Sequence, residues 1–482
     1  MERKSGVLMH ISSLWGEFSI GNFGKEAYRF VDFLKKAGFT LWQVLPFCMT
    51  DENNSPFSSP SAFSVNPYFI DLEELYNKRM IDEEDLLCEK QDSPYCVLYD
   101  KLKSSRIDVL KKASKKVRNK EKILSYVKEN PEIHKFCEFM ALKTANNYEI
   151  WTKWNTKEFD DDEYFAWCFI VYEFMSEWKK LKTYANENGI KIIGDMPFYV
   201  SFDSSDVWGN KSLFKLNENN EPDNVSGVPP DYFSNKGQFW GNPLYNWDEM
   251  KKDGFLWWKK RFEFMLSLFD GVRIDHFRAF GSFWSIDNKS QDAKTGKWEN
   301  GPGKDLINEI KEVTKNKIII AEDLGEDLKE TKELVDYSGF LSTKVFQFGF
   351  MGSDDNPHLP HNYNEKCACY TGTHDNDTLF GFLEKMGDSD KNELLKYCVC
   401  DSKTAEHQID AIIRTVISSS AKLAIIPMQD LLKSSSYSRM NTPGKAHGNW
   451  KFRITKNELE RIDTQKLRDI NEIFKRIKRV VT

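Results

Sequence analysis

The chain has 482 residues, of which 40% are hydrophobic and 29% charged, a composition typical of globular proteins and unlike that of disordered ones. The net charge of −6 argues against a nucleic-acid partner. The nine cysteines lack the paired C-x-x-C spacing of a zinc site, and no apolar run is long enough to span a membrane. The N-terminus lacks the apolar core of a signal peptide, so we expect a cytoplasmic protein with free thiols.

Eight short apolar runs have the composition of β-strands. They do not alternate strictly between apolar and polar residues, as expected for parallel strands buried on both faces. The runs are GVLMHI (6–11), LWQVLPF (41–47), KIIGDMPFYV (191–200), GVRIDHF (271–277), KIIIAEDL (317–324), TKVFQFGF (343–350), CACYTG (367–372) and LAIIPMQDLL (423–432). Helical patterns lie between most of them, and two of these, 25–38 and 163–189, end at a glycine. This succession predicts an α/β fold in which residues 1–482 form a single (β/α)8 barrel.

Two gaps between the predicted strands are too long for simple barrel loops. Residues 72–160, between the second and third strands, are charged with helical spacing and predict a helical insertion beside the barrel mouth. Residues 201–250, between the third and fourth strands, are rich in Gly, Pro, Asn, Trp and Tyr and have little periodicity. We expect this second insertion to be a loop region that faces the substrate, although a purely structural excursion has the same composition.

Several predicted strands end in acidic residues rather than in the turn residues that usually follow a strand. Asp275 comes two residues after Arg273, on the same strand face, and is followed by His276; both neighbours are expected to keep Asp275 ionised. Glu322 follows four apolar residues, and the resulting desolvation should raise its pKa into the range of a general acid. Taken singly, each acid has a competing explanation: a strand-end salt bridge for Asp275 and a cap of the following helix for Glu322.

Two further acids follow the same pattern. Asp375, in TGTHDND, is suited to contact substrate hydroxyls or to stabilise positive charge, and a turn role is the competing explanation. For Asp195, in IIGDMPFYV, a structural turn is an equally good explanation. Together, four strand-end acids in chain order would converge at the C-terminal mouth of a barrel. Asp275 and Glu322, on consecutive strands, could supply the two carboxyl groups about 5–5.5 Å apart that retaining glycoside cleavage uses, a chemistry that needs no metal.

Nine segments carry a resemblance to a known family: residues 6–47, 55–72, 193–210 and 226–247, GVRIDHFRAF (271–280), AEDLG (321–325), YTGTHDNDT (370–378), IPMQDLL (426–432) and NTPGKAHGNWKFR (441–453). In this order they resemble the 4-α-glucanotransferase (amylomaltase, or disproportionating enzyme) family, which is related to the α-amylase clan. The resemblance extends over nearly the whole chain. The combination of GVPPDYFS, HDNDT and NTPG is more specific than the general α-amylase motifs.

The resemblance implies a role for each matching residue. Asp275 matches the nucleophile that carries the glucosyl intermediate, Glu322 the acid/base and Asp375 the transition-state stabiliser. Further positions are implied to contact or support substrate: Asp195, Arg273, His374, Tyr232, Phe233, Phe57, Trp240 and Asn242, with Gln238 and Gln347 as weaker candidates. The pair Tyr232 and Phe233 matches the family's lid over the acceptor side, whereas core packing is an equally good explanation for Trp240.

The implied activity is the retaining transfer of an α-1,4-glucan segment to the 4-hydroxyl of another glucan or of glucose, without metal or cofactor. The implied donors and acceptors are maltooligosaccharides and dextrins derived from starch or glycogen. The chain differs from the family pattern at Phe57, where Tyr is common, and at residues 10–13, where His-Ile-Ser-Ser replaces His-Pro-Thr-Ser. A hydrolase on the same barrel and a non-catalytic glucan-binding barrel are the alternatives; the presence of both Asp275 and Glu322 argues against the second.

Overall fold

A closed barrel of eight parallel strands forms the centre of the computed structural model, which describes all residues except 1, 92–93, 231–233, 326–328, 351–354 and 479–482. The barrel strands are β1 (Lys4–Leu8), β2 (Leu41–Gln43), β3 (Lys191–Met196), β6 (Gly271–Ile274), β9 (Ile318–Ala321), β10 (Leu341–Val345), β11 (Cys367–Tyr370) and β12 (Leu423–Pro427). Their order around the barrel is β1-β12-β11-β10-β9-β6-β3-β2. The prediction of a (β/α)8 barrel is confirmed.

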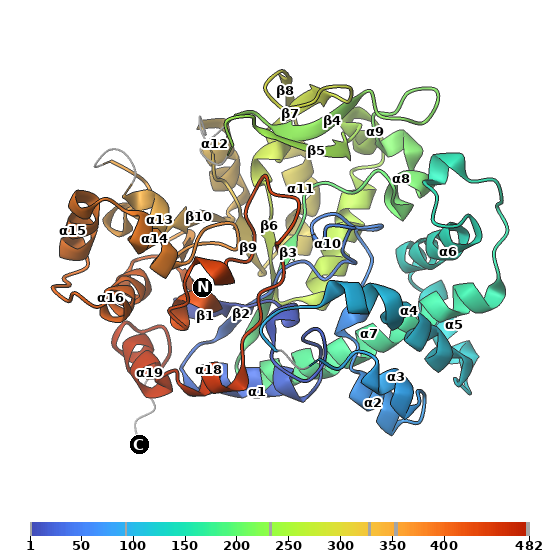
Figure 1. Cartoon of the computed structure of the whole chain (residues 1–482). Coiled ribbons are helices and arrows are strands. Elements are labelled where there is room, and N and C mark those ends of the chain that lie inside the picture. Colours follow the sequence, from blue (N-terminus) through green and yellow to red (C-terminus); the bar gives the residue numbers. More distant parts are fainter. Residues whose placement is uncertain (1, 92–93, 231–233, 326–328, 351–354, 479–482) are drawn as a thin grey trace.

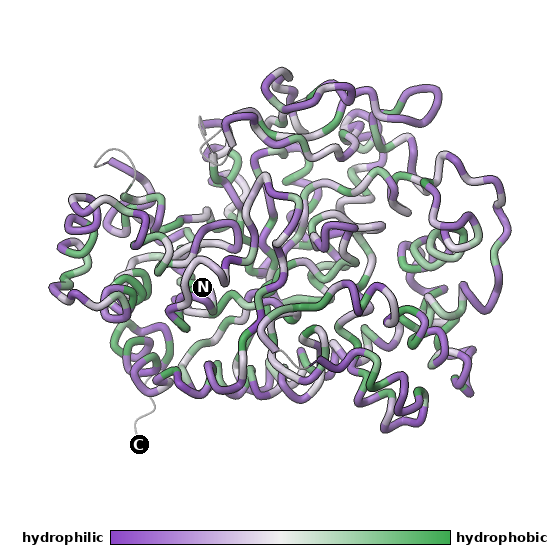
Figure 2. Tube along the Cα trace, viewed as in Figure 1, coloured by the Kyte–Doolittle hydropathy of each residue, from purple (hydrophilic) through white to green (hydrophobic). Residues whose placement is uncertain are grey.

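Helices on the outside of the barrel follow most of its strands (Figure 1). They are α1 (Lys25–Lys36), α7 (Asp161–Glu187), α10 (Leu256–Leu268), α11 (Gly303–Thr314), α12 (Lys329–Ser338), α16 (Ala405–Ser418) and α19 (Thr464–Ile473). In α1, the buried residues Phe30, Val31 and Leu34 recur at helical spacing, which gives the helix one apolar face against the barrel. Figure 2 shows the same alternation of hydrophobic and hydrophilic residues along the helices around the barrel.

The long connection between β2 and β3 is helical. It contains α2 (Leu72–Asn77), α3 (Glu83–Leu87), α4 (Tyr99–Lys115), α5 (Lys120–Lys128) and α6 (Pro131–Ala145). The last three pack against α7, which has 27 residues and is the longest helix among the described residues. The helix α7 therefore packs both against the barrel, through β3, and against α4, α5 and α6. No helix of the described ranges is long and apolar enough to cross a membrane.

A four-stranded antiparallel sheet, which the sequence did not predict, covers one side of the barrel mouth (Figure 1). Its strands are β4 (Asn224–Val228), β5 (Gln238–Pro243), β7 (Ser282–Asp287) and β8 (Lys297–Asn300), in the order β5-β4-β7-β8. Residues 201–250 thus contain two strands as well as the helices α8 (Ser205–Gly209) and α9 (Trp247–Lys252). The strands are short and contain Gly, Pro and Asn, and half of the sheet comes from beyond β6, so local patterns did not reveal it.

All eight predicted strands extend beyond the C-terminal ends of the observed ones, and in two of them an α-helix begins within the predicted run. Strand β10 ends at Val345, where α13 (Phe346–Gly349) begins, and β12 ends at Pro427, before α17 (Met428–Leu431). In both cases one apolar run serves a strand and the helical turn after it, and periodicity alone does not separate the two. The remaining helices, α14 (Leu379–Lys385), α15 (Asp388–Tyr397) and α18 (Lys456–Glu460), lie in the C-terminal third of the chain.

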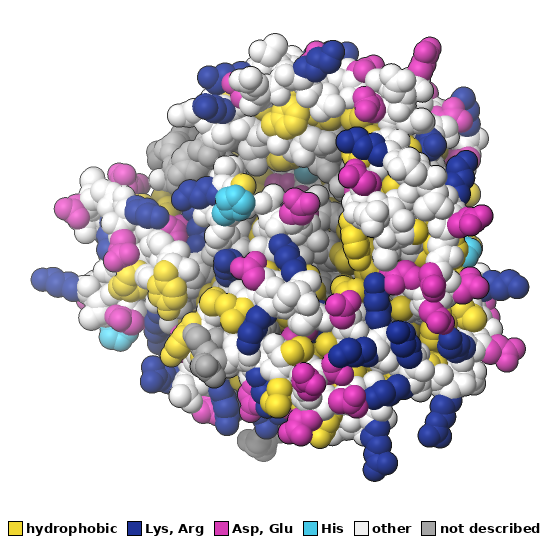
Figure 3. Space-filling model, turned by 45° about the vertical axis from the view of Figure 1, so that its right-hand side comes forward, with side chains coloured by type: hydrophobic (Ala, Val, Ile, Leu, Met, Phe, Trp, Pro, Cys, Tyr) yellow, Lys and Arg dark blue, Asp and Glu magenta, His cyan; other side chains and the backbone are white. Residues whose placement is uncertain are grey.

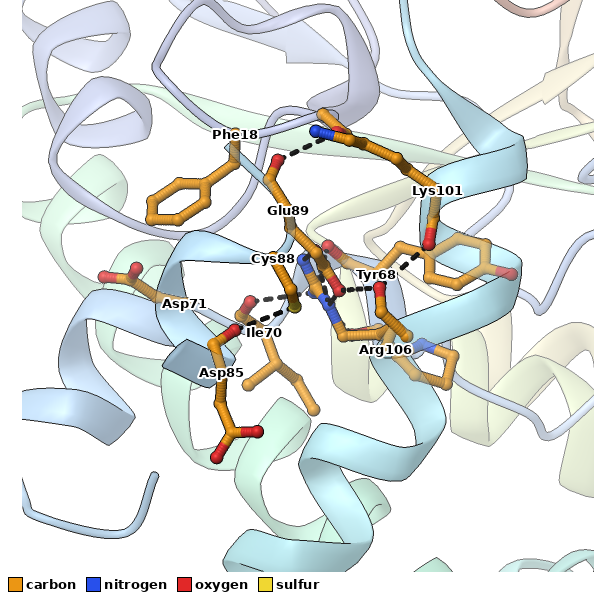
Figure 4. A network of polar contacts seen from close by, with 12 residues as sticks. Phe18, Tyr68, Ile70, Asp71, Asp85, Cys88, Glu89, Lys101 and Arg106 are labelled. Atoms are coloured by element: carbon orange, nitrogen blue, oxygen red, sulfur yellow. Dashed lines mark hydrogen bonds and ion pairs between the residues drawn. The ribbon is translucent and has the colours of Figure 1, made fainter. Parts of the chain in front are cut away.

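A fully buried ion pair ties the helical connection to the loops of the barrel (Figure 4). Arg106 of α4 donates from Nε to Glu89 at 2.9 and 3.0 Å, and neither side chain is exposed. Its Nη1 atom donates to the backbone carbonyls of Pro67, Tyr68 and Ile70. The carbonyl of Glu89 in turn accepts from the backbone and side chain of Ser19. The pair therefore joins α4 to the two chain segments around Ser19 and Pro67.

We expect Arg106→Ala to lower the free energy of unfolding by about 3–5 kcal/mol, because it leaves the Glu89 carboxylate buried without its partner. Lys116→Ala is the matched control, since it breaks an ion pair with Asp82 whose side chains are 43% and 79% exposed. The control should cost about 0–1 kcal/mol. Urea unfolding measures both, and equal losses in the two variants would contradict the structural importance of the buried pair.

Candidate active site

A cleft of about 800 Å³ opens at the C-terminal ends of the barrel strands. Loops after β2, β3, β6, β9 and β11 line it, together with the four-stranded sheet and the segment 441–450. Figure 3 shows this face hollowed between the sheet at the top and the loops below. Three predicted acids, Asp275, Glu322 and Asp375, lie on its wall. Within the described ranges, no three His, Cys, Asp or Glu side chains are placed to hold a metal ion.

Arg273 lies beneath the cleft between two carboxylates. The parallel register places it beside Asp195 on the neighbouring strand β3. One nitrogen, Nη1, donates to both carboxylate oxygens of Asp195 at 2.8 Å and to Oδ1 of Asp275 at 2.9 Å. Burial alone would lower the pKa of Arg273, but the two carboxylates outweigh it and raise the pKa well above its usual value. Asp275 therefore has a permanent cation at one oxygen, while 29% of its side chain stays exposed.

Glu322 stands beside Asp275 on the next strand, because Ile274 of β6 is in register with Ala321 of β9. Its carboxylate accepts from the backbone N–H of His276 at 2.8 Å and of Leu324 at 3.3 Å. Burial raises the pKa of Glu322 to about 8, the cation of Arg273 opposes this shift, and the negative charge of Asp275 adds to it. At neutral pH, Glu322 is therefore protonated and suited to donate a proton.

Asp375 faces the cleft from the turn after β11. Asn441 donates to its Oδ1 at 2.6 Å, and Nε2 of His374 lies 3.4 Å from its Oδ2. The turn itself is held by Asn376, whose side-chain oxygen accepts from the backbone N–H and hydroxyl of Thr373 at 2.8 Å. Since Asn376 makes the turn bonds, the carboxylate of Asp375 is left to face the cleft.

An aromatic group forms the wall next to Asp375. The rings of Phe57 and His374 stack with centroids 5.1 Å apart and planes 15° apart, and Trp450 lies 5.7 and 5.9 Å from them. Burial lowers the pKa of His374, although Asp375 opposes the shift, so the imidazole is neutral. Trp450 has a left-handed backbone (φ 65°), and its carbonyl accepts from the hydroxyl of Tyr99 at 3.1 Å. The helix α4 thereby supports one wall of the cleft.

The expectation that His276 keeps Asp275 ionised is wrong. His276 has a left-handed backbone (φ 48°), and this turn directs its ring away from Asp275 and against Trp240, with centroids 4.8 Å apart. Burial lowers the pKa of His276 to about 3, so the ring is neutral, and its Nε2 has no hydrogen-bond partner among the described residues. The functional part of His276 is its backbone N–H, which holds Glu322.

The expectation that Asp195 contacts sugar also needs correction. Its side chain has no exposure and does not line the cleft, because Arg273 covers it. Burial raises the pKa of Asp195, and the charge of Arg273 opposes this shift. From this position Asp195 acts on Arg273 rather than on anything in the cleft.

The other predicted contacts fall into three groups. Phe57, Trp240, Asn242 and Gln238 line the cleft. Gln347 does not, because it is buried and donates to the backbone carbonyl of Asp377 at 2.7 Å. Tyr232 and Phe233 lie outside the described residues.

Several cleft residues were not singled out from the sequence. They are Asn441, Trp450, Arg278 and Trp298. Asn441 and Trp450 lie in the segment NTPGKAHGNW, which contributed to the family resemblance and was the available signal. Nothing in the local pattern around Trp298 indicated that a strand would bring it to the cleft.

Comparisons with known proteins agree over almost the whole chain. Residues 9–459 match the profile of a protein family described as 4-alpha-glucanotransferase. The chain is 42% identical to a 4-alpha-glucanotransferase from Clostridium butyricum, over 97% of this chain and 100% of that protein. It is 39% identical to one from Streptococcus pneumoniae, over 99% and 98% of the two chains.

Solved structures give the same result. The amylomaltase from Streptococcus agalactiae in complex with acarbose has a TM-score of 0.93 and 36% identity, over 98% of this chain and 100% of that one. The amylomaltase from Corynebacterium glutamicum has a TM-score of 0.80 at 16% identity, over 98% of this chain and 75% of that one, which is a likeness of fold.

We expect Asp195→Ala to lower kcat about 100-fold, because Arg273 loses the partner that positions it and shifts relative to Asp275. Glu173→Ala is the control, since it removes another buried carboxylate that is paired with a cation, Lys78, and neither residue lines the cleft, so kcat should stay close to the wild-type value. Steady-state kinetics at a temperature where both variants are folded separate the two cases. Equal kcat losses in both variants would mean that Asp195 only supports folding.

Proposed function

The chain belongs to the 4-alpha-glucanotransferase family, and we propose that Asp275, Glu322 and Asp375 carry out the transfer. In this proposal an α-1,4-glucan is cleaved, one part is held covalently on Asp275, and that part passes to the 4-hydroxyl of another glucan or of glucose. The observation that carries the assignment is the contrast between two neighbouring carboxyl groups. Asp275 is paired with Arg273, whereas burial keeps Glu322 protonated.

In the first step, an oxygen of Asp275 attacks the anomeric carbon and the bond to the glycosidic oxygen breaks. Glu322 gives its proton to that oxygen, so the leaving glucan departs as a neutral alcohol. Adjacent strand tips lie about 4.8 Å apart, which suits the roughly 5–5.5 Å between carboxyl groups in retaining enzymes.

In the second step, the Glu322 carboxylate takes the proton of an acceptor hydroxyl, whose oxygen attacks the anomeric carbon and releases Asp275. Two displacements at one carbon retain its configuration. The hydrogen bonds that Glu322 accepts from the backbone of His276 and Leu324 stabilise the ionised form needed at this stage.

Asp375 stabilises the positive charge that develops on the sugar ring in both steps. Its bond from Asn441 fixes the carboxylate, and the neutral His374 beside it adds no positive charge. Phe57, Trp240 and Asn242 are proposed sugar contacts, since all three line the cleft. The proposed contacts of Tyr232 and Phe233 rest on the sequence alone.

We propose maltooligosaccharides and dextrins derived from starch or glycogen as substrates, since each is both donor and acceptor for this reaction. A cytoplasmic location is proposed from the cysteines: all nine are free, and Cys367 and Cys369, two residues apart, are both buried thiols. Free thiols in this number are typical of a reducing compartment.

Purified protein incubated with maltotriose alone should produce glucose together with a series of longer maltodextrins. Asp275→Ala and Glu322→Gln should each lower this activity by about 10³-fold or more, because one removes the nucleophile and the other the transferable proton. Glu312→Gln, which changes an exposed carboxyl group outside the cleft, should keep it. Chromatography of the products measures all four proteins.

Glucose and maltose without longer products would indicate a hydrolase and contradict the transfer. Full activity in Asp275→Ala or Glu322→Gln would contradict the assignment of that residue.

A further inference from the structure

The four-stranded sheet carries a row of aromatic side chains that extends the cleft away from the acids. The strand register places Phe239 of β5, Gly227 of β4, Trp284 of β7 and Trp298 of β8 directly opposite one another in turn. Residues directly opposite in neighbouring strands share one face of a sheet. The row therefore crosses the whole sheet on a single face.

The two ends of this row lie open on the cleft wall. Phe239 is 38% exposed and Trp298 is 42% exposed, and both line the cleft that contains the acids. Three strand spacings of about 4.8 Å place the two ends roughly 14 Å apart. This span fits several linked sugar rings rather than one.

Trp298 is held in place rather than free to move. The guanidinium of Arg278 lies over its ring, 4.0 Å from the centroid, and Trp284 contacts it at 5.2 Å with the planes 61° apart. Arg278 itself lines the cleft and comes three residues after Asp275. A ring fixed on two sides while partly open to the cleft loses little entropy when a ligand packs against it.

The strands that carry the cleft residues indicate which part of the substrate lies near Phe239 and Trp298. The proton donor Glu322 must face the side of the cleaved bond where the leaving glucan departs and the acceptor enters. Leu324 follows Glu322 after β9, Arg278 follows Asp275 after the neighbouring strand β6, and Arg278 lies over the ring of Trp298 in β8. Asp375 follows β11, which lies beyond β10 on the other side of β9 from β6, and Phe57 lies in the loop after β2.

We propose that Phe239 and Trp298 form a distal subsite for the outer glucose residues of the acceptor chain. The subsite rests on the proposed function, since it is an extension of the same cleft. Glucose rings have apolar C–H faces that pack against the faces of aromatic rings. Short acceptors end before they reach Trp298, so this subsite makes the enzyme favour long acceptors over short ones.

The test uses α-maltosyl fluoride as donor, so that no leaving glucan occupies the acceptor side. Fluoride leaves with the proton of Glu322 as hydrogen fluoride while the bond from Asp275 to the anomeric carbon forms, and the acceptor hydroxyl then displaces Asp275 and gives its proton to the Glu322 carboxylate. The measured quantity is kcat/KM for acceptors from glucose to maltoheptaose. We expect the wild-type value to rise with acceptor length.

In Trp298→Ala, the ratio of kcat/KM for maltoheptaose to that for glucose should fall about tenfold, which corresponds to about 1.4 kcal/mol. Phe239→Ala should lower kcat/KM relative to glucose already for acceptors shorter than those that Trp298→Ala affects. Trp298→Phe keeps an aromatic ring and should retain most of the wild-type ratio for maltoheptaose. Tyr437→Ala is the control: this aromatic residue is 81% exposed outside the cleft, and the ratio should stay unchanged.

A ratio equal to the wild-type value in both Trp298→Ala and Phe239→Ala would overturn the subsite. A uniform loss for all acceptors would overturn it too, because it would indicate damage to the cleft rather than to a distal contact. Failure of the wild-type enzyme to transfer maltosyl units to any acceptor would instead contradict the proposed function. If Trp298→Ala does not fold, Phe239→Ala and Trp298→Phe still decide the question.

Discussion

The arrangement of the cleft depends on one guanidinium group. Arg273 is 3% exposed, so its charge has to be balanced within the protein, and the parallel register supplies Asp195 from the neighbouring strand. The same nitrogen reaches Asp275 at the strand tip. One buried cation thus fixes the orientation and the charge of the carboxylate that faces the cleft.

Glu322 differs from Asp275 in its partners although the two stand side by side. Asp275 has an ion pair, whereas Glu322, among the described residues, accepts hydrogen bonds only from backbone N–H groups. Burial outweighs the charge of Arg273 at Glu322 and raises its pKa. The two acids therefore differ in their local contacts: Asp275 is paired with a cation, whereas burial keeps Glu322 protonated.

The barrel could be predicted from the sequence because each of its strands is a short apolar run. Parallel strands that are buried on both faces have this composition regardless of which strands they pair with. The antiparallel sheet could not, since β4 and β5 are separated along the chain from β7 and β8 by the barrel strand β6. Its aromatic row exists only in the folded protein, as the register of four short strands.

Asp275 and Glu322 were predictable for the same reason as the strands, because each directly follows an apolar run, and Asp375 was predictable because it comes shortly after another, CACY. The direction of the side chains around them was not. Sequence adjacency predicted that the ring of His276 contacts Asp275, but the left-handed turn at this residue directs it against Trp240. Asp195 has the same pattern as the other acids, and only the register shows that Arg273 covers it.

The central claim is that Glu322 is protonated at neutral pH beside an Asp275 that is paired with Arg273, and the pH dependence of kcat/KM on maltotriose tests it most directly. Since kcat/KM reports groups of the free enzyme, and the acid form of Glu322 is lost as the pH rises through its pKa, activity should decline above a pKa of about 8. A decline that already begins above about pH 4.5, the range of an ordinary glutamate, would contradict the account.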